Sequence, residues 1–136
     1  RIVLLVEDNT DDEFFTCQGL NTSDVPLTIH VAHDGAEALD MLFTVPGPQL
    51  NPDLIVLDLN MPKLDGIAVL VRLRQEKRTR LTPVVMFTSS AQPDEVTRAF
   101  EAGANSYIAK PLEFETFVKF KENGNDKRDK HERRLF

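Results

Sequence analysis

The chain has 136 residues, of which 22 are acidic and 16 basic, giving a formal net charge of −6 at pH 7. This length fits one domain that buries roughly two thirds of its unfolded surface, and the acidic balance disfavours a general nucleic-acid binder, which needs a concentrated positive face. The lone Cys17 excludes an internal disulfide and favours a reducing compartment, and no apolar run is long enough to cross a membrane. We therefore expect a cytoplasmic protein without a membrane partner.

The first predicted strand is the apolar run of residues 2 to 6, which ends in the acids Glu7 and Asp8. A short run of branched apolar residues is typical of a strand buried on both faces of a parallel sheet. A helix is expected over residues 11 to 20, and its phenylalanines are assigned to the core. Threefold spacing predicts its inward stripe: Phe14, Cys17 and Leu20.

The second predicted strand covers residues 27 to 32, and the helix after it begins at Asp34. Asp34 and Glu37 have the spacing of a capping box, in which both side chains accept hydrogen bonds from backbone N–H groups at the helix start. This helix should extend to about Phe43, because the proline-rich segment 46–52 interrupts it.

The central predicted strand, residues 54 to 59, is apolar except for Asp58 near its carboxyl end. In open parallel sheets, ligands bind in the crevice outside the carboxyl ends of the strands. From this strand alone, Asp58 could coordinate a metal, attack phosphorus or cap the next helix.

The next predicted helix begins at Asp65 and Gly66. Apolar spacing indicates its inward residues: Ile67, Leu70 and Leu73. Its basic residues are assigned to water and to the helix C-terminus, with no ligand: Arg72, Arg74, Lys77 and Arg78.

The fourth predicted strand, residues 83 to 90, ends in hydroxyl side chains that include Thr88. The helix after it begins near Pro93 and ends at Gly103. The apolar stripe of this helix is predicted to be Val96, Ala99 and Phe100.

The last predicted strand, residues 106 to 109, leads to Lys110 and Pro111, and a final helix is expected from about Leu112. Strand and helix thus alternate five times along the chain. This order predicts an α/β fold with a doubly wound parallel sheet, covered by helices on both faces.

Parallel strands would bring together five functional side chains at one edge of the sheet: Glu7, Asp8, Asp58, Thr88 and Lys110. Unit charges about 4 Å apart interact by roughly 4 kcal/mol at an effective dielectric constant of about 20, so clustered carboxylates repel unless a cation or proton joins them. Oxygen ligands of this kind suit Mg²⁺. One carboxylate could then attack a phosphoryl group, whose charge Lys110 and the Thr88 hydroxyl would stabilise.

Five motifs follow one another between about residues 2 and 118: Val6-Glu7-Asp8-Asn9, residues 57 to 62 with Asp65-Gly66, residues 84 to 89, Gly103-Ala104 leading to Tyr107, and Lys110-Pro111. Together they resemble the receiver domain of two-component response regulators. The resemblance implies a flavodoxin-like sheet with strand order 2-1-3-4-5. The loop over residues 46 to 52 and the extension over 79 to 82 are similar to those of single-domain regulators that partner bacteriophytochromes.

The resemblance implies that Asp58 accepts a phosphoryl group from a phosphohistidine on a sensor histidine kinase. Mg²⁺ would be bound directly by Asp8, Asp58 and the backbone carbonyl of Asn60, while Glu7 would act through water. The domain would then be a phosphoacceptor with self-phosphotransfer and autodephosphorylation, and not an enzyme in any further sense.

Thr88 and Tyr107 occupy the positions of the switch pair in the family that the sequence resembles. Their rearrangement would change the surface formed by the fourth helix, fifth strand and fifth helix, which would contact a downstream protein or form a homodimer. The resemblance also implies a cis peptide bond between Lys110 and Pro111.

The receiver domain is assigned to residues 1–122 and a charged C-terminal tail to residues 123–136. Asn123-Gly124-Asn125 is poor helix material, and the charges that follow favour a disordered tail. A helix in solvent or a partner-binding arm is the alternative.

Two other functions fit parts of the sequence. A phosphatase of the haloacid-dehalogenase kind also uses an aspartate nucleophile and Mg²⁺, but Asn60 cannot serve as its general acid and no cap segment fits this length. A nucleic-acid-binding module could use residues 119 to 134, but these contain seven basic against four acidic residues, a weak excess for phosphate binding. A Rossmann enzyme lacks support because no glycine-rich phosphate loop is present.

Overall fold

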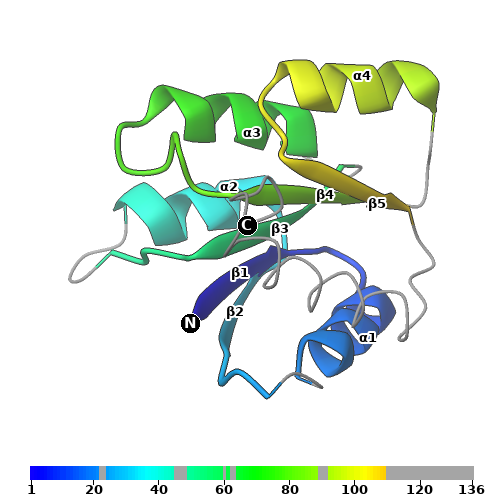
Figure 1. Cartoon of the computed structure of the whole chain (residues 1–136). Helices are drawn as coiled ribbons and strands as arrows, with labels where there is room; N and C mark the ends of the chain where they lie inside the picture. The colour runs from blue at the N-terminus through cyan, green and yellow to red at the C-terminus, as the bar shows by residue number, and fades with distance from the viewer. Residues whose placement is uncertain (22–23, 45–48, 60, 62–63, 89–91, 110–136) are drawn as a thin grey trace.

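The computed structural model of the protein describes residues 1–21, 24–44, 49–59, 61, 64–88 and 92–109. Strands and helices alternate along this part of the chain (Figure 1). In order, the elements are β1 (Ile2–Val6), α1 (Thr10–Leu20), β2 (Thr28–Ala32), α2 (Gly35–Leu39), the π-helical turn η1 (Asp40–Thr44), β3 (Leu54–Asp58), α3 (Gly66–Gln75), β4 (Val84–Thr88), α4 (Pro93–Glu101) and β5 (Ser106–Ala109).

The five strands form one sheet in the order β2-β1-β3-β4-β5, and every pair of neighbours is parallel. The predicted α/β fold and strand order 2-1-3-4-5 are therefore confirmed. The register pairs Asp58 with Phe87 and Thr88 with Ala109, so the carboxyl ends of β3, β4 and β5 lie at one edge.

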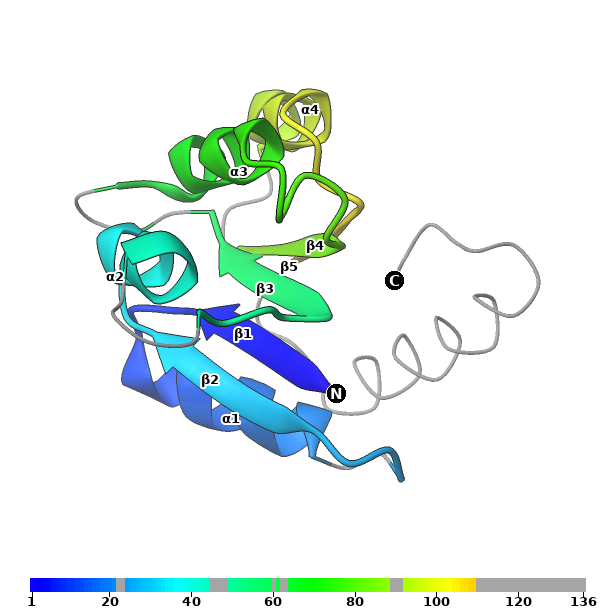
Figure 2. The same cartoon turned by 90° about the vertical axis from the view of Figure 1, so that its left-hand side faces the viewer.

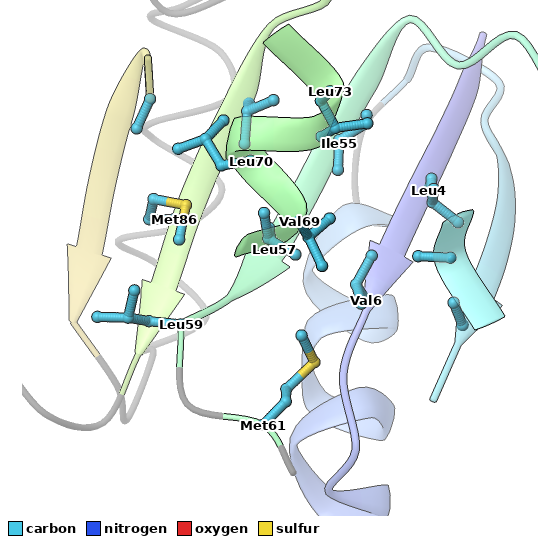
Figure 3. Packing of buried hydrophobic residues seen from close by; sticks show 14 of the residues in the cluster. Leu4, Val6, Ile55, Leu57, Leu59, Met61, Val69, Leu70, Leu73 and Met86 are labelled. Carbon is cyan, nitrogen blue, oxygen red and sulfur yellow. The ribbon is translucent and has the colours of Figure 1, made fainter. Parts of the chain in front are cut away.

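Alternate residues of the central strands pack on opposite faces of the sheet. One face is covered by α2, η1, α3 and α4, where Leu57 lies beside Val69 of α3 and Met86 lies near Leu70 (Figure 3). The other face carries α1, which contributes Leu20 (Figure 2). Every residue of β3 and β4 is buried, as expected for strands covered on both sides.

Aspartate caps set the starts of α2 and α3, as the sequence predicts. The Asp34 carboxylate accepts a hydrogen bond from the Glu37 N–H at 2.8 Å, and the Asp65 carboxylate accepts one from the Ala68 N–H at 2.9 Å. The Glu37 side chain reaches back to the N–H of His33, one residue earlier than a standard capping box requires.

Replacing Asp65 by alanine should lower the free energy of unfolding by about 1 kcal/mol, because α3 loses the acceptor for one of its first N–H groups. Urea denaturation measures this loss. Asp65→Asn is the matched control, since asparagine caps a helix about as well as aspartate. A cap role for Asp65 would be wrong if the two variants were equally destabilised.

The predicted inward stripe of α1 is wrong at Phe14. Phe14 and Phe15 are each 57% exposed, and their rings contact one another edge to face with centroids 5.7 Å apart. The buried residues of the helix are Thr16, Gly19 and Leu20. Leu20 is therefore in the core as predicted, but the core assignment of the phenylalanines does not hold.

Arg74 and Arg78, which the sequence pattern assigns to water, also make hydrogen bonds within the protein that the sequence does not predict. Arg78 donates hydrogen bonds to the carbonyl oxygens of Leu42 and Leu50, at 2.6 and 2.8 Å, and its guanidinium lies 5.7 Å from the centre of the Phe43 ring. These contacts join the turn after α3 to η1 and to the segment before β3.

Two other helix predictions need correction. The helix that begins at Asp34 is α-helical only to Leu39 and continues as the π-helical turn η1. In α4, Ala99 is buried as predicted, but Phe100 is 47% exposed.

Several predictions fall outside the described residues. They concern Asn60, Lys110, the Lys110–Pro111 bond, the last helix, and the division between a domain of residues 1–122 and a tail of residues 123–136. These remain predictions. Within the part of the chain that the structure describes, no helix has the length and apolar character needed to cross a membrane.

Candidate functional site

Three carboxylates meet at the carboxyl edge of the sheet. Glu7 and Asp8 follow β1, and Asp58 ends the neighbouring strand β3. One oxygen of each side chain lies within 4.8 Å of the others. The structure thus brings together the three acidic residues that the sequence predicts at this edge.

Burial differs among the three acids. Glu7 is fully buried and Asp58 is 4% exposed, whereas Asp8 is exposed. Among the described residues, the cluster therefore reaches solvent at Asp8. An all-oxygen set of this kind fits a hard divalent cation such as Mg²⁺ or Mn²⁺.

The start of α1 orients Glu7. The backbone N–H of Asn9 donates a hydrogen bond to Glu7 Oε2 at 3.1 Å, while the Asn9 side chain accepts one from the Asp12 N–H at 3.0 Å. Asn9 therefore caps the helix and holds a site carboxylate at the same time. The sequence does not indicate the second role, because a backbone contact to Glu7 leaves no pattern in the residue types.

Gly66 packs against the backbone of Asp58 and Leu59. Its N–H donates to the carbonyl oxygen of Leu59 at 3.0 Å, and a Cβ atom at this position would lie 2.4 Å from the carbonyl oxygen of Asp58. Only glycine permits this close approach of α3 to the end of β3. Asp65 thus caps α3, and Gly66 positions Asp58.

Thr88 and Tyr107 lie on the same face of neighbouring strands. Thr88 is fully buried at the end of β4, and the register places Tyr107 two residues before the partner of Thr88 on β5. Burial raises the pKa of the Tyr107 hydroxyl above its usual value, and the negative charge of Glu95 on α4 raises it further. Tyr107 is therefore a neutral phenol at physiological pH, and its ring packs against the core on the face that α4 covers.

A parallel sheet of this order, with an acidic cluster at its carboxyl edge and a buried threonine on the adjacent strand, defines a flavodoxin-like signalling domain. The model of the response regulator receiver domain family matches residues 3–120. The chain belongs to this family. Receiver domains are phosphoacceptors of two-component systems, interact with histidine kinases and downstream effectors, and bind divalent cations at an acidic pocket.

Two curated relatives cover most of the chain. The probable methanogenesis regulatory protein FilR2 of Methanothrix harundinacea is 37% identical over 115 residues, which are 84% of this chain and 74% of FilR2. The response regulator Rcp1 of Synechocystis sp. is 35% identical over 113 residues, which are 81% of this chain and 76% of Rcp1.

Solved structures show the same likeness. The Mn²⁺-bound form of Rcp1 superposes with a TM-score of 0.81 at 31% identity and covers 90% of this chain and 92% of Rcp1. The bacteriophytochrome response regulator AtBRR superposes with a TM-score of 0.73 at 39% identity, covering 88% of each chain. The predicted similarity to single-domain regulators of the bacteriophytochrome type is thereby confirmed.

Proposed function

We propose that this chain is a phosphorylation-controlled switch in which Asp58 accepts a phosphoryl group from a phosphohistidine of a sensor histidine kinase. The observation that supports this most strongly is the position of Asp58. It is a nearly buried carboxylate at the carboxyl end of the central strand, and oxygens of Glu7 and Asp8 lie within 4.8 Å.

In the proposed reaction, a carboxylate oxygen of Asp58 attacks the phosphorus atom. The new O–P bond forms as the P–N bond of the phosphohistidine breaks, and the electron pair of that bond returns to the imidazole nitrogen. Hydrolysis of the acyl phosphate by water returns Asp58 to its carboxylate form. No further enzymatic activity is part of the proposal.

The proposed ligands of Mg²⁺ are the Asp8 and Asp58 carboxylates with the backbone carbonyl of Asn60, and Glu7 acts through water. When bound, Mg²⁺ supplies positive charge that balances the clustered carboxylates and the phosphoryl oxygens. Lys110 and the Thr88 hydroxyl are the proposed protein donors to those oxygens.

Thr88 and Tyr107 are the proposed switch residues. Their common face and adjacent strands support this, because a shift of the Thr88 hydroxyl toward the phosphoryl group would change the space next to the Tyr107 ring. The surface of α4, β5 and the segment after β5 would then contact a downstream protein or a second copy of the chain.

The likeness to AtBRR supports a bacteriophytochrome as the kinase partner of this chain. A cytoplasmic location is also part of the proposal, and the lone cysteine agrees with a reducing compartment.

The test is intact mass spectrometry after incubation with acetyl phosphate and Mg²⁺. The wild-type chain should gain one phosphoryl group, and Asp58→Asn should gain none, because an amide does not form the acyl phosphate. Asp65→Asn, which keeps its helix cap and leaves the acidic cluster unchanged, should be phosphorylated like the wild type.

A phosphoryl group that persists in Asp58→Asn would show that another residue is the acceptor. Size-exclusion elution of the same samples tests the homodimer. Earlier elution of the phosphorylated wild type, and not of Asp58→Asn, would support assembly under phosphorylation control, whereas unchanged elution would contradict the homodimer and leave a monomeric switch.

A further inference from the structure

The Arg74 side chain joins three segments near the amino ends of β4 and β5. The acidic cluster lies at the carboxyl ends of the strands. It makes six hydrogen bonds of 2.8 to 3.2 Å to five oxygen atoms. The acceptors are the backbone carbonyls of Thr79, Arg80, Thr82 and Gly103, and the side-chain amide oxygen of Asn105.

These contacts differ from those of an ordinary surface arginine. All six go to carbonyl and amide oxygens, and burial lowers the pKa of the Arg74 guanidinium below its usual value. A partly buried cation is stable only if its N–H groups are satisfied. The fixed fork of the guanidinium meets this need at several acceptors at once, which a lysine cannot do.

The end of α4 is shaped to receive Arg74. Gly103 has a φ angle of 114°, a conformation that favours glycine. A Cβ atom at Gly103 would lie 2.8 Å from Arg74 Nε and 2.9 Å from its Cγ atom. The glycine therefore ends α4 and leaves room for the arginine to reach the Gly103 carbonyl.

Asn105 extends the network into the sheet. Its amide oxygen accepts hydrogen bonds from the Val84 N–H at 2.8 Å and from Arg74 Nη2 at 3.0 Å, while its N–H donates to the Val84 carbonyl at 2.9 Å. Arg74, Gly103 and Asn105 thus connect the end of α3, the end of α4, and the amino ends of β4 and β5. We call these three residues the arginine clamp.

The arginine clamp and Thr88 lie at opposite ends of β4, and Tyr107 lies between them on β5, two residues after Asn105. β4 runs from Val84, next to the clamp, to Thr88 at the acidic edge. With a rise of about 3.3 Å per residue, the two ends are about 13 Å apart. α4 starts at Pro93 on the switch side and ends at the clamp, whose contacts hold its C-terminal end.

We propose that the arginine clamp is the fixed pivot of the α4–β5 unit. It holds the C-terminal end of α4 and the amino ends of β4 and β5 in place, so that a change at Asp58 moves only the opposite end of this unit. Arg74 is a positioning residue for the output surface and does not contact the reacting groups. This inference rests on the proposed function, because the motion begins at Asp58.

The test is hydrogen exchange measured by mass spectrometry with and without beryllofluoride and Mg²⁺, on wild type, Arg74→Met and Arg74→Lys. In the wild type, the amides of Ala104 and Asn105, which donate to Ala99 and Val84, should exchange at the same slow rate in both states. In Arg74→Met they should exchange about tenfold faster or more when beryllofluoride is bound than when it is absent. Arg74→Lys should give a smaller dependence in the same direction, and serves if the methionine variant does not fold.

The matched control is Arg72→Met, which removes the same charge from the same helix. Arg72 is exposed and pairs with Glu76 at 2.9 Å, so this variant should behave as the wild type. Exchange at residues 104 and 105 that rises equally in both states would indicate a purely structural arginine and would overturn the pivot. Exchange that does not differ from that of Arg72→Met would overturn it too.

Intact mass of the same variants after incubation with acetyl phosphate and Mg²⁺ separates the two proposals. A wild type that takes up no adduct overturns the phosphoacceptor function and the pivot with it. An adduct in both wild type and Arg74→Met, without the beryllofluoride-dependent exchange, overturns the pivot alone.

Discussion

Mg²⁺ at about one hundred times its dissociation constant should stabilise the wild-type chain by about 2.7 kcal/mol and raise its unfolding temperature by about 10 °C. The physical cause is the acidic cluster. Oxygens of Glu7, Asp8 and Asp58 lie within 4.8 Å of one another only in the folded chain, so the unfolded chain offers no comparable site. Thermal unfolding followed by circular dichroism over a Mg²⁺ titration measures the effect.

Asp8→Asn should abolish this stabilisation, because it removes the exposed carboxylate of the cluster. Without Mg²⁺, the same variant should be slightly more stable than the wild type, by about 1 kcal/mol or less, because one repulsive charge is gone and Asp8 is screened by solvent. Asp11→Asn is the control, since Asp11 lies in the first turn of α1 outside the cluster. An equal response to Mg²⁺ in Asp8→Asn and wild type would contradict the proposed ligand.

Gly66→Ala should lower the free energy of unfolding by about 2 kcal/mol and slow phosphorylation by acetyl phosphate roughly 100-fold. The new Cβ atom would lie 2.4 Å from the Asp58 carbonyl oxygen and 2.8 Å from the Leu59 Cα atom, so the end of β3 must move. Urea denaturation gives the stability, and the rate of phosphoryl uptake by intact mass gives the effect on the site.

Leu73→Ala separates the two effects of the Gly66 substitution. Leu73 is fully buried near the other end of α3 (Figure 3), and its truncation should cost about 3 kcal/mol. Where both variants remain folded, Leu73→Ala should take up the phosphoryl group at the wild-type rate. If Leu73→Ala were slowed as much as Gly66→Ala, the loss would reflect general instability and the positioning role of Gly66 would be wrong.

The strands and the acidic cluster could be predicted because their signals are local. Continuous apolar runs mark β1, β3 and β4, and the acid that ends a run lies at the sheet edge once the strands are parallel. The caps at Asp34 and Asp65 are also local, because each side chain bonds to an N–H group three residues later.

The contacts that could not be predicted join segments distant in sequence. Arg74 bonds to Gly103 and Asn105, and Arg78 bonds to Leu42 and Leu50. Basic residues near the end of a helix normally indicate a solvent-exposed face, so the sequence does not predict these contacts. Phe14 is the opposite case. An aromatic residue at threefold spacing normally indicates a core position, but Phe14 is exposed. The rotation of α1 on the sheet decides its exposure, and no local pattern records that rotation.

The register of β3 determines where the chain can tolerate insertions and deletions without losing its acidic site. Side chains alternate between the two faces, with Ile55 and Leu57 packed on one face and Val56 on the other, so a shift by one residue would exchange the two sets. The same shift would remove Asp58 from the acidic edge. A length change inside this strand therefore damages folding and phosphoacceptance together, whereas the connections between strands and helices can change length without either penalty. Related sequences should accordingly differ in loop length, while the number of residues between the buried residues of β3 and the aspartate at its end stays constant.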